Sequence, residues 1–197
     1  MKCPSCASPL ATAEPRCPSC KLTLKALDIK FGALPRHAMY FTDRTDRVPM
    51  AEMKAARQAL ELFHRRFPQC LFSVFVADLP RGTSVREYAF WLANRARFSS
   101  VEHAQGDNFD LLLVIDVAGR TAALNVGYGL EEHLREEDLE AALDAFAGPM
   151  REGNMPAAVQ ACLEVIDAQL QRRWMAVNEE ATRAAAVAER TAEETWA

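Results

Sequence analysis

Hydrophobic positions along the chain change their spacing several times, and each spacing predicts a different kind of element. Between Pro49 and Pro68 the apolar residues recur at helical spacing, which predicts a helix with one buried face: Met50, Met53, Ala56, Leu60, Phe63 and Phe67. Residues 70–78 form a short β-rich run and predict a strand. Ser84 and Glu87 then stand at capping-box spacing, so a second helix is expected to follow them.

Two further β-type runs lie in the middle of the chain, at residues 109–117 and 120–127, and only Ala118 and Gly119 separate them. So short a separation predicts an antiparallel hairpin.

Helical spacing returns after the hairpin and predicts two more helices. The first is expected to end near Gly148 and Pro149, and the second to begin at Pro156. The last twenty residues keep high helix propensity but carry few large apolar groups, which predicts a solvated helix that frays. This order of elements predicts an α/β fold in which helices pack on a small mixed sheet.

The first part of the chain has a different character. Residues 1–21 are rich in Cys, Pro and Ser and have no period long enough to build a core. Residues 22–36 alternate apolar and polar positions and break at Gly32 and Pro35, which predicts a short extended segment and a connector. We therefore divide the chain into a small N-terminal unit, a connector, a main domain and a C-terminal helical extension, at residues 1–24, 25–40, 41–172 and 173–197.

Length and charge narrow the classes of function. A chain of 197 residues with 50% hydrophobic content can bury one sizeable core and carry a small appendage. Its formal net charge of -4 supplies no basic surface for a polyanion, so nucleic acid is not favoured as a partner. No stretch approaches the roughly 20 apolar residues of a membrane span, and no secretory signal is visible, so we expect a soluble cytoplasmic protein.

Four of the six cysteines stand in two identical CPSC tetrapeptides, at residues 3–6 and 17–20, with ten residues between them. Each pair can close a tight knuckle, and two knuckles can surround one zinc ion with four thiolates. The expected zinc ligands are Cys3, Cys6, Cys17 and Cys20. Four protein ligands leave no open position for a substrate, so such an ion would be structural. The alternative is a redox pair or a set of disulfides.

These paired CPxC units resemble the zinc-ribbon family over residues 1 to about 24. The resemblance implies a structural zinc ion and a ribbon that can engage a protein partner. Lys21 occupies the position after the last cysteine, where many ribbons carry Gly. The remaining cysteines, Cys70 and Cys162, stand at a strand start and in an apolar helical face, which predicts buried core thiols.

Four separated blocks resemble, in order, those of the TPM domain family, which includes a thylakoid acid phosphatase. The blocks are SVREYAFWLANRARF, QGDNFDLLLVID, RTAALNVGYGLEEHL and GPMREGNMPAAVQACLEVI. The similarity runs from about Phe41 to Leu170. It implies an α/β sandwich with helices on a central sheet, and an acidic cleft that in some members binds calcium and supports phosphomonoester hydrolysis.

The family's DNG turn is matched at Asp107 and Asn108, but Phe109 replaces its Gly. Asp107, Asn108 and Asp110 offer oxygen ligands for a divalent cation such as calcium, and Asp78 joins them if the two strands are neighbours. In the simpler interpretation the first two form a turn and Asp78 ends a strand.

Two interpretations of function remain. The preferred one is an accessory or ligand-binding protein with a zinc ribbon and a TPM-like domain. The alternative is a metal-dependent, acid-phosphatase-like phosphomonoester hydrolase.

Overall fold

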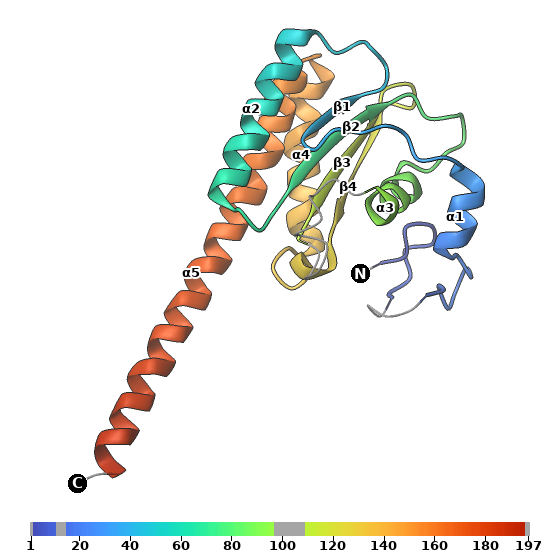
Figure 1. Cartoon of the computed structure of the whole chain (residues 1–197). Coiled ribbons are helices and arrows are strands. Elements are labelled where there is room, and N and C mark those ends of the chain that lie inside the picture. The colour runs from blue at the N-terminus through green and yellow to red at the C-terminus, as the bar shows by residue number, and fades with distance from the viewer. Residues whose placement is uncertain (1, 11–14, 97–108, 196–197) are drawn as a thin grey trace.

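The computed structural model describes residues 2–10, 15–96 and 109–195, except for the side chains of residues 176–195. Within these residues, five α-helices pack on a four-stranded mixed sheet (Figure 1). Helices α2, α4 and α5 cover one face of the sheet, and α3 with α1 outside it covers the other. The predicted α/β fold is therefore confirmed.

The sheet has the order β1-β2-β3-β4. The strands are β1 (Phe41–Asp43), β2 (Phe72–Ala77), β3 (Leu111–Asp116) and β4 (Thr121–Val126). The first three run parallel, and β4 returns antiparallel to β3. The hairpin is thus confirmed, whereas β1 is a strand that the hydrophobic pattern did not reveal.

The helices are α1 (Leu24–Phe31), α2 (Met50–Arg66), α3 (Val85–Arg95), α4 (Glu136–Arg151) and α5 (Met155–Thr195), with a short 3-10 helix at Tyr128–Leu130. The predicted cap of α3 forms, because the Ser84 hydroxyl accepts a hydrogen bond from the Glu87 N–H. Helix α5 leaves the body of the molecule and projects away from it (Figure 1). Within the described part of the chain, no helix is both long and apolar enough to span a membrane.

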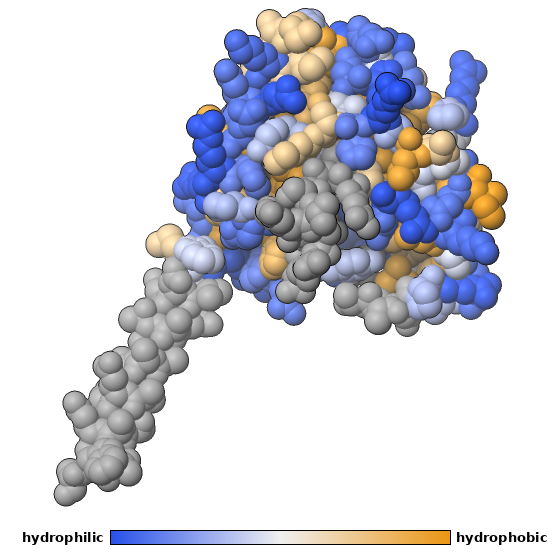
Figure 2. All heavy atoms as spheres, viewed as in Figure 1, coloured by the Kyte–Doolittle hydropathy of each residue, from blue (hydrophilic) through white to orange (hydrophobic). Residues whose placement is uncertain are grey.

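Both faces of the central strands are buried, since successive side chains of a strand point to opposite sides of the sheet. Val74 and Leu113 belong to the larger core, shared with α2, α4 and α5. Phe75 and Val114 belong to the smaller core, which includes Trp91 of α3. On the outside, hydrophilic residues cover most of the face seen in Figure 2, interrupted by small hydrophobic patches.

Residues 22–36 do not contain the extended segment that their alternation predicted. Thr23 caps a helix instead, because its hydroxyl accepts a hydrogen bond from the Ala26 N–H at 3.1 Å. Gly32 ends that helix with a φ of 71°. Leu27 is 1% exposed because it is buried in the core under α3. Capping and burial therefore prevail over a short alternating pattern.

The connection between β3 and β4 is also longer than predicted. It spans four residues, 117–120, and the left-handed position is Arg120 with a φ of 53°. Gly119 is needed for a different reason: a Cβ there would lie 2.2 Å from Oδ2 of Asp116. Helix α4 likewise continues past Gly148 to Arg151, since a proline in the last turn removes only one helical hydrogen bond.

Candidate metal centre

The four predicted zinc ligands converge at the N-terminus of the structure. Cys3 and Cys17 are buried, whereas Cys6 and Cys20 are exposed. Their four Sγ atoms all lie within 4.8 Å of one another, and Cys3–Cys20 and Cys6–Cys17 are each 3.6 Å apart. The edge of a tetrahedron with Zn–S bonds of about 2.3 Å is about 3.8 Å, whereas a disulfide requires about 2.05 Å. The spacing therefore fits metal ligation, and all four thiols are free.

Two equivalent backbone knuckles hold these thiols. In the first, the Cys3 carbonyl accepts from the N–H of Ala7 at 2.9 Å, and the Cys3 N–H donates to the Ser8 carbonyl at 2.8 Å. The second knuckle repeats both bonds from Cys17, at 3.0 and 2.9 Å. The repeated tetrapeptide thus encodes a repeated local fold.

Each knuckle places a residue with a Cβ in the left-handed region. Ala7 has a φ of 59° and Lys21 a φ of 64°. This conformation costs a residue with a side chain about 1 kcal/mol or more, which is why Gly is usual there. The Lys21 ammonium donates to the Pro18 carbonyl at 2.5 Å across the knuckle. The missing Gly therefore strains the second knuckle without opening it.

Neighbouring groups shift the pKa values of the cysteine thiols in opposite directions. The hydroxyl and N–H of Ser8 lower the pKa of Cys6 to about 6. Backbone N–H groups, that of Cys20 foremost, also lower the pKa of Cys17. The Leu22 N–H acts in the same direction on Cys20, but desolvation and the other three thiols raise its pKa to about 12. A donor set whose members oppose one another's ionisation fits a divalent cation, which would neutralise the thiolates.

Polar contacts attach the cysteine cluster to the rest of the protein. Lys2 forms an ion pair with Glu136 at the start of α4. Glu87 of α3 accepts from the Ser5 hydroxyl and pairs with Lys30 of α1 at 2.6 Å. Burial raises the pKa of Glu87, but the hydrogen bonds from Lys30 and Ser5 outweigh burial and keep that pKa below its usual value. The cluster is thus fixed to α4 and α3, which cover opposite faces of the sheet.

A groove separates the cysteine cluster from the sheet edge. Its volume is about 590 Å³, and its walls come from the N-terminal segment, α3, β4 and the start of α4. The wall residues include Pro4, Pro9, Phe90, Leu124 and Leu134. Among the described residues β4 is the last strand of the sheet, so one side of the groove is a strand edge that no other described strand pairs with.

Of the aspartates predicted to bind a divalent cation, the structure describes Asp78 and Asp110, and these two are not brought together. Asp107 and Asn108 lie outside the described residues. Asp78 forms a two-pronged ion pair with Arg47, with N–O distances of 3.1 and 2.6 Å. The neighbouring strands β2 and β3 are parallel, so Asp78 follows their carboxyl ends while Asp110 precedes their amino ends. A six-residue strand spans about 20 Å, which separates these two aspartates.

The other carboxylates at the carboxyl edge have structural partners. Asp43, at the end of β1, accepts from the N–H and hydroxyl of Thr45, both at 2.7 Å. Asp116, at the end of β3, accepts from the N–H groups of Leu79 at 3.0 Å and Gly119 at 3.1 Å. Within the described ranges, the four cysteines are the one cluster whose ligand atoms lie at metal-binding distances.

The family model for the TPM domain matches residues 42–169. The chain belongs to the TPM domain family. Its TPM domain begins within β1 and ends in α5, so the cysteine cluster and α1 precede the matched part. The family was recognisable in the sequence from its four blocks, and this recognition is confirmed.

Solved structures share the fold of this TPM domain. The NMR structure of the BA42 protein from Bizionia argentinensis superposes with a TM-score of 0.54 at 13% identity, over 66% of this chain and 86% of that one. The N-terminal domain of a P. gingivalis protein gives 0.53 at 22% identity, over 66% and 83%. The N-terminal domain of the cg2496 protein of Corynebacterium glutamicum gives 0.50 at 14% identity, over 65% and 77%. A comparison with curated proteins finds no match.

Cys70 and Cys162 are core thiols of the TPM domain, as predicted, and Phe109 and His64 also pack against described residues of this domain. Cys70 and Cys162 are 2% and 0% exposed, and burial raises the pKa of each thiol to about 12. Phe109, in place of the family's Gly, is partly buried against the larger core. His64 lies at the edge of α2, with Nδ1 2.9 Å from the Cys70 carbonyl and its ring against Tyr40.

Sequence reasoning missed the contacts that α1 makes. Asp28 of α1 accepts from Arg95 and from the Trp91 indole N–H in α3. The local sequence around Asp28, in a segment interpreted as a connector, does not reveal these contacts. Its partners lie more than sixty positions away along the chain.

Proposed function

We propose that this protein is a zinc-stabilised binding module, in which a ribbon ligated at Cys3, Cys6, Cys17 and Cys20 docks on a TPM domain. The observation that carries this proposal is the convergence of the four Sγ atoms to within 4.8 Å. Zinc would supply the stability that so short a segment cannot obtain from a core of its own. Four thiolates fill its coordination sphere, so the ion has a structural role.

The groove beside the ribbon supports a role in binding a protein partner. Ribbon residues form one wall and TPM-domain residues the other, so a partner in the groove would contact both units. The unpaired edge of β4 presents main-chain groups, to which an extended peptide can add as a further strand. The net charge of -4 does not favour nucleic acid in this place. Six free thiols suit the reducing conditions of the cytoplasm, where we place the protein.

An accessory role fits the carboxylates better than catalysis does. Asp43, Asp78 and Asp116 are engaged by a turn, by Arg47 and by backbone N–H groups, respectively. The alternative is a phosphomonoester hydrolase whose divalent cation, such as calcium, is held by Asp107 and Asn108 with Asp78. Its support is the match to the family's DNG turn, which carries Phe109 in place of Gly.

Metal analysis of the purified protein tests the ribbon. We expect one zinc per chain, and less than about a tenth of that in the double variant Cys6→Ser and Cys20→Ser. The matched control is Cys162→Ser, which changes a thiol in the core and should keep the zinc. Absence of zinc from protein purified under reducing conditions would overturn the proposal.

An assay of phosphomonoester hydrolysis separates the two functions. The binding module should show no turnover of a generic aryl phosphate with calcium or magnesium. Metal-dependent turnover that is lost in Asp107→Ala and kept in the zinc-free double variant would establish the hydrolase instead.

A further inference from the structure

A second pocket lies where the parallel strands β1 and β2 end. Its volume is about 490 Å³, and it is enclosed by α1, the ends of β1 and β2, and the turn that leads into α3. The residues that line it include Lys30, Phe31, Arg44, Thr83 and Tyr88. Helix α1 lies outside the matched TPM segment, so this pocket depends on a part of the chain that the family model does not include.

The charges around the pocket leave one cation uncompensated. Lys30 is paired with Glu87, and Asp78 with Arg47. Arg44 also lines the pocket, and no ion pair joins it to a carboxylate among the residues the structure describes. A guanidinium of this kind offers two parallel N–H groups that match a carboxylate.

The backbone fixes Arg44 at the mouth of the pocket. It directly follows β1, and its N–H donates to the Val76 carbonyl at 2.8 Å, which continues the pairing of β1 with β2. The charge of Arg44 acts on Tyr88: burial raises the pKa of the Tyr88 hydroxyl, and Arg44 opposes that rise. Arg44 and Tyr88 both line the pocket, and the guanidinium charge is close enough to act on the phenol.

The wall beside this charge is aromatic. The rings of Phe31 and Tyr88 meet edge to face, with centroids 5.1 Å apart and an interplanar angle of 77°. Both rings are half-buried, so part of each is accessible. Pro35 and Pro80 add apolar surface to the same pocket. A flat apolar body fits such a wall, with its anionic end at Arg44.

We propose that this pocket binds a small aryl carboxylate, with the carboxylate on Arg44 and the ring against Phe31 and Tyr88. The pocket shares no residue with the cysteine cluster, so the zinc proposal and this one fail independently.

Titration of the 15N-labelled full-length protein, as purified, with benzoate tests the proposal by NMR. We expect chemical-shift changes of the amides of Phe31, Thr83 and Tyr88. The dissociation constant should be on the order of 1 mM, because so small a ligand makes few contacts. Benzamide has the same shape without the charge and should bind at least about tenfold more weakly. Inorganic phosphate has the charge without the ring, and it should also bind at least about tenfold more weakly.

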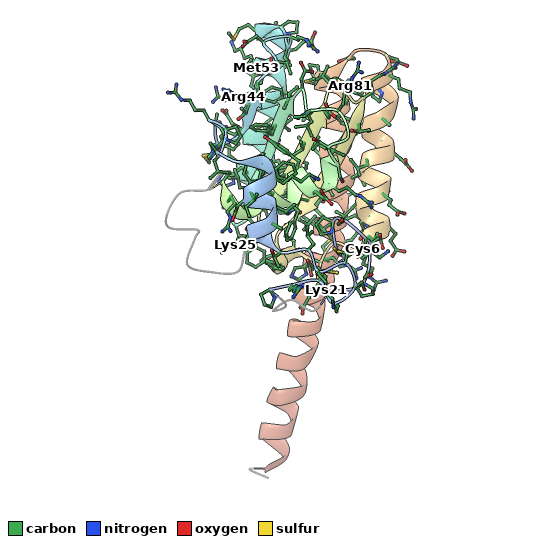
Figure 3. The ribbon with its side chains drawn as sticks, turned by 90° about the vertical axis from the view of Figure 1, so that its right-hand side faces the viewer. Cys6, Lys21, Lys25, Arg44, Met53 and Arg81 are labelled. Atoms are coloured by element: carbon green, nitrogen blue, oxygen red, sulfur yellow. The ribbon has the colours of Figure 1, made fainter. Side chains whose placement is uncertain are left out.

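Two arginine variants provide the matched comparison. Arg44 and Arg81 lie at separate points along the upper part of the face in Figure 3, and both are exposed. Arg44→Gln should weaken benzoate binding about tenfold or more, whereas Arg81→Gln, with the same change of charge, should stay within about twofold. Equal binding of benzamide, equal binding of phosphate, or equal loss in both variants would overturn the proposal.

Discussion

Asp28 and Arg95 join α1 to α3 through two hydrogen bonds, from Nε at 2.7 Å and from Nη2 at 2.5 Å. The same carboxylate accepts the indole N–H of Trp91 at 3.1 Å. One side chain of α1 thus gathers two partners from a helix of the TPM domain. This contact holds the segment between the cysteine cluster and the sheet in place.

Asp28→Asn should loosen α1. Arg95, foremost, lowers the pKa of Asp28 in the folded protein, and Trp91 adds to the effect. Because the folded pKa is the lower one, the stabilisation is complete above the ordinary value of 3.8 and is lost as the pH falls through the lowered value. We expect hydrogen exchange of the α1 amides to rise about two- to fivefold at neutral pH in Asp28→Asn. Asp144→Asn, on the exposed side of α4, is the control and should leave this exchange unchanged.

Lys21→Gly should tighten zinc binding. The change removes a Cβ from a position with a φ of 64° and so relieves the backbone strain there. This relief exceeds the cost of the greater conformational entropy that Gly loses on folding. We expect zinc affinity to increase roughly two- to fivefold in competition with a chelator. Lys21→Ala is the control, because it removes the hydrogen bond to Pro18 but keeps the strain. Affinities that are equal in the two variants would contradict the prediction.

Gly119→Ala should destabilise the TPM domain. The new Cβ would lie 2.2 Å from Oδ2 of Asp116, whose other oxygen holds the N–H groups of Leu79 and Gly119. Displacing this buried carboxylate should lower the free energy of unfolding by about 1–3 kcal/mol in urea denaturation. Gly148→Ala is the control, because a Cβ at Gly148 meets nothing within 4 Å. This variant should change the free energy of unfolding by less than about 1 kcal/mol. Similar losses in both variants would rule out the steric explanation.

Thiol counting should separate the cysteines into two classes. A zinc chelator removes the ion that holds the N-terminal knuckles, so a thiol reagent at pH 8 should modify their four cysteines rapidly while the TPM domain stays folded. Cys70 and Cys162 should react only after unfolding, because burial excludes the reagent and raises the pKa of each thiol to about 12. Denaturant should then bring the total to six. Rapid reaction of all six in the folded state would show that these two thiols are accessible.

Long periodic segments were predictable from sequence because each has a single buried face that its own residues specify. Helix α2 follows its apolar stripe, with Ala56, Leu60 and Phe63 buried as predicted. The hairpin was recognisable because two β-type runs stood close together. The cysteine cluster was recognisable because a knuckle is local, so its residue spacing alone specifies the fold of each pair.

Elements that depend on distant partners were not predictable. Strand β1 has only three residues, and it forms by pairing with β2, more than thirty positions later. Helix α1 has only eight residues, too few to be stable alone, and owes its stability to Leu27 and Asp28 packing against α3. Neither partner is visible in the local pattern.

The sequence by itself determined the TPM family and the four thiols that lie within reach of one ion. Only the tertiary structure decided which acidic groups can act together. Asp78 and Asp110 border neighbouring strands, but parallel pairing places them at opposite edges of the sheet, and Arg47 engages Asp78. The physical reason is that spacing along the chain fixes local geometry, whereas strand direction and ion pairing depend on contacts between distant segments.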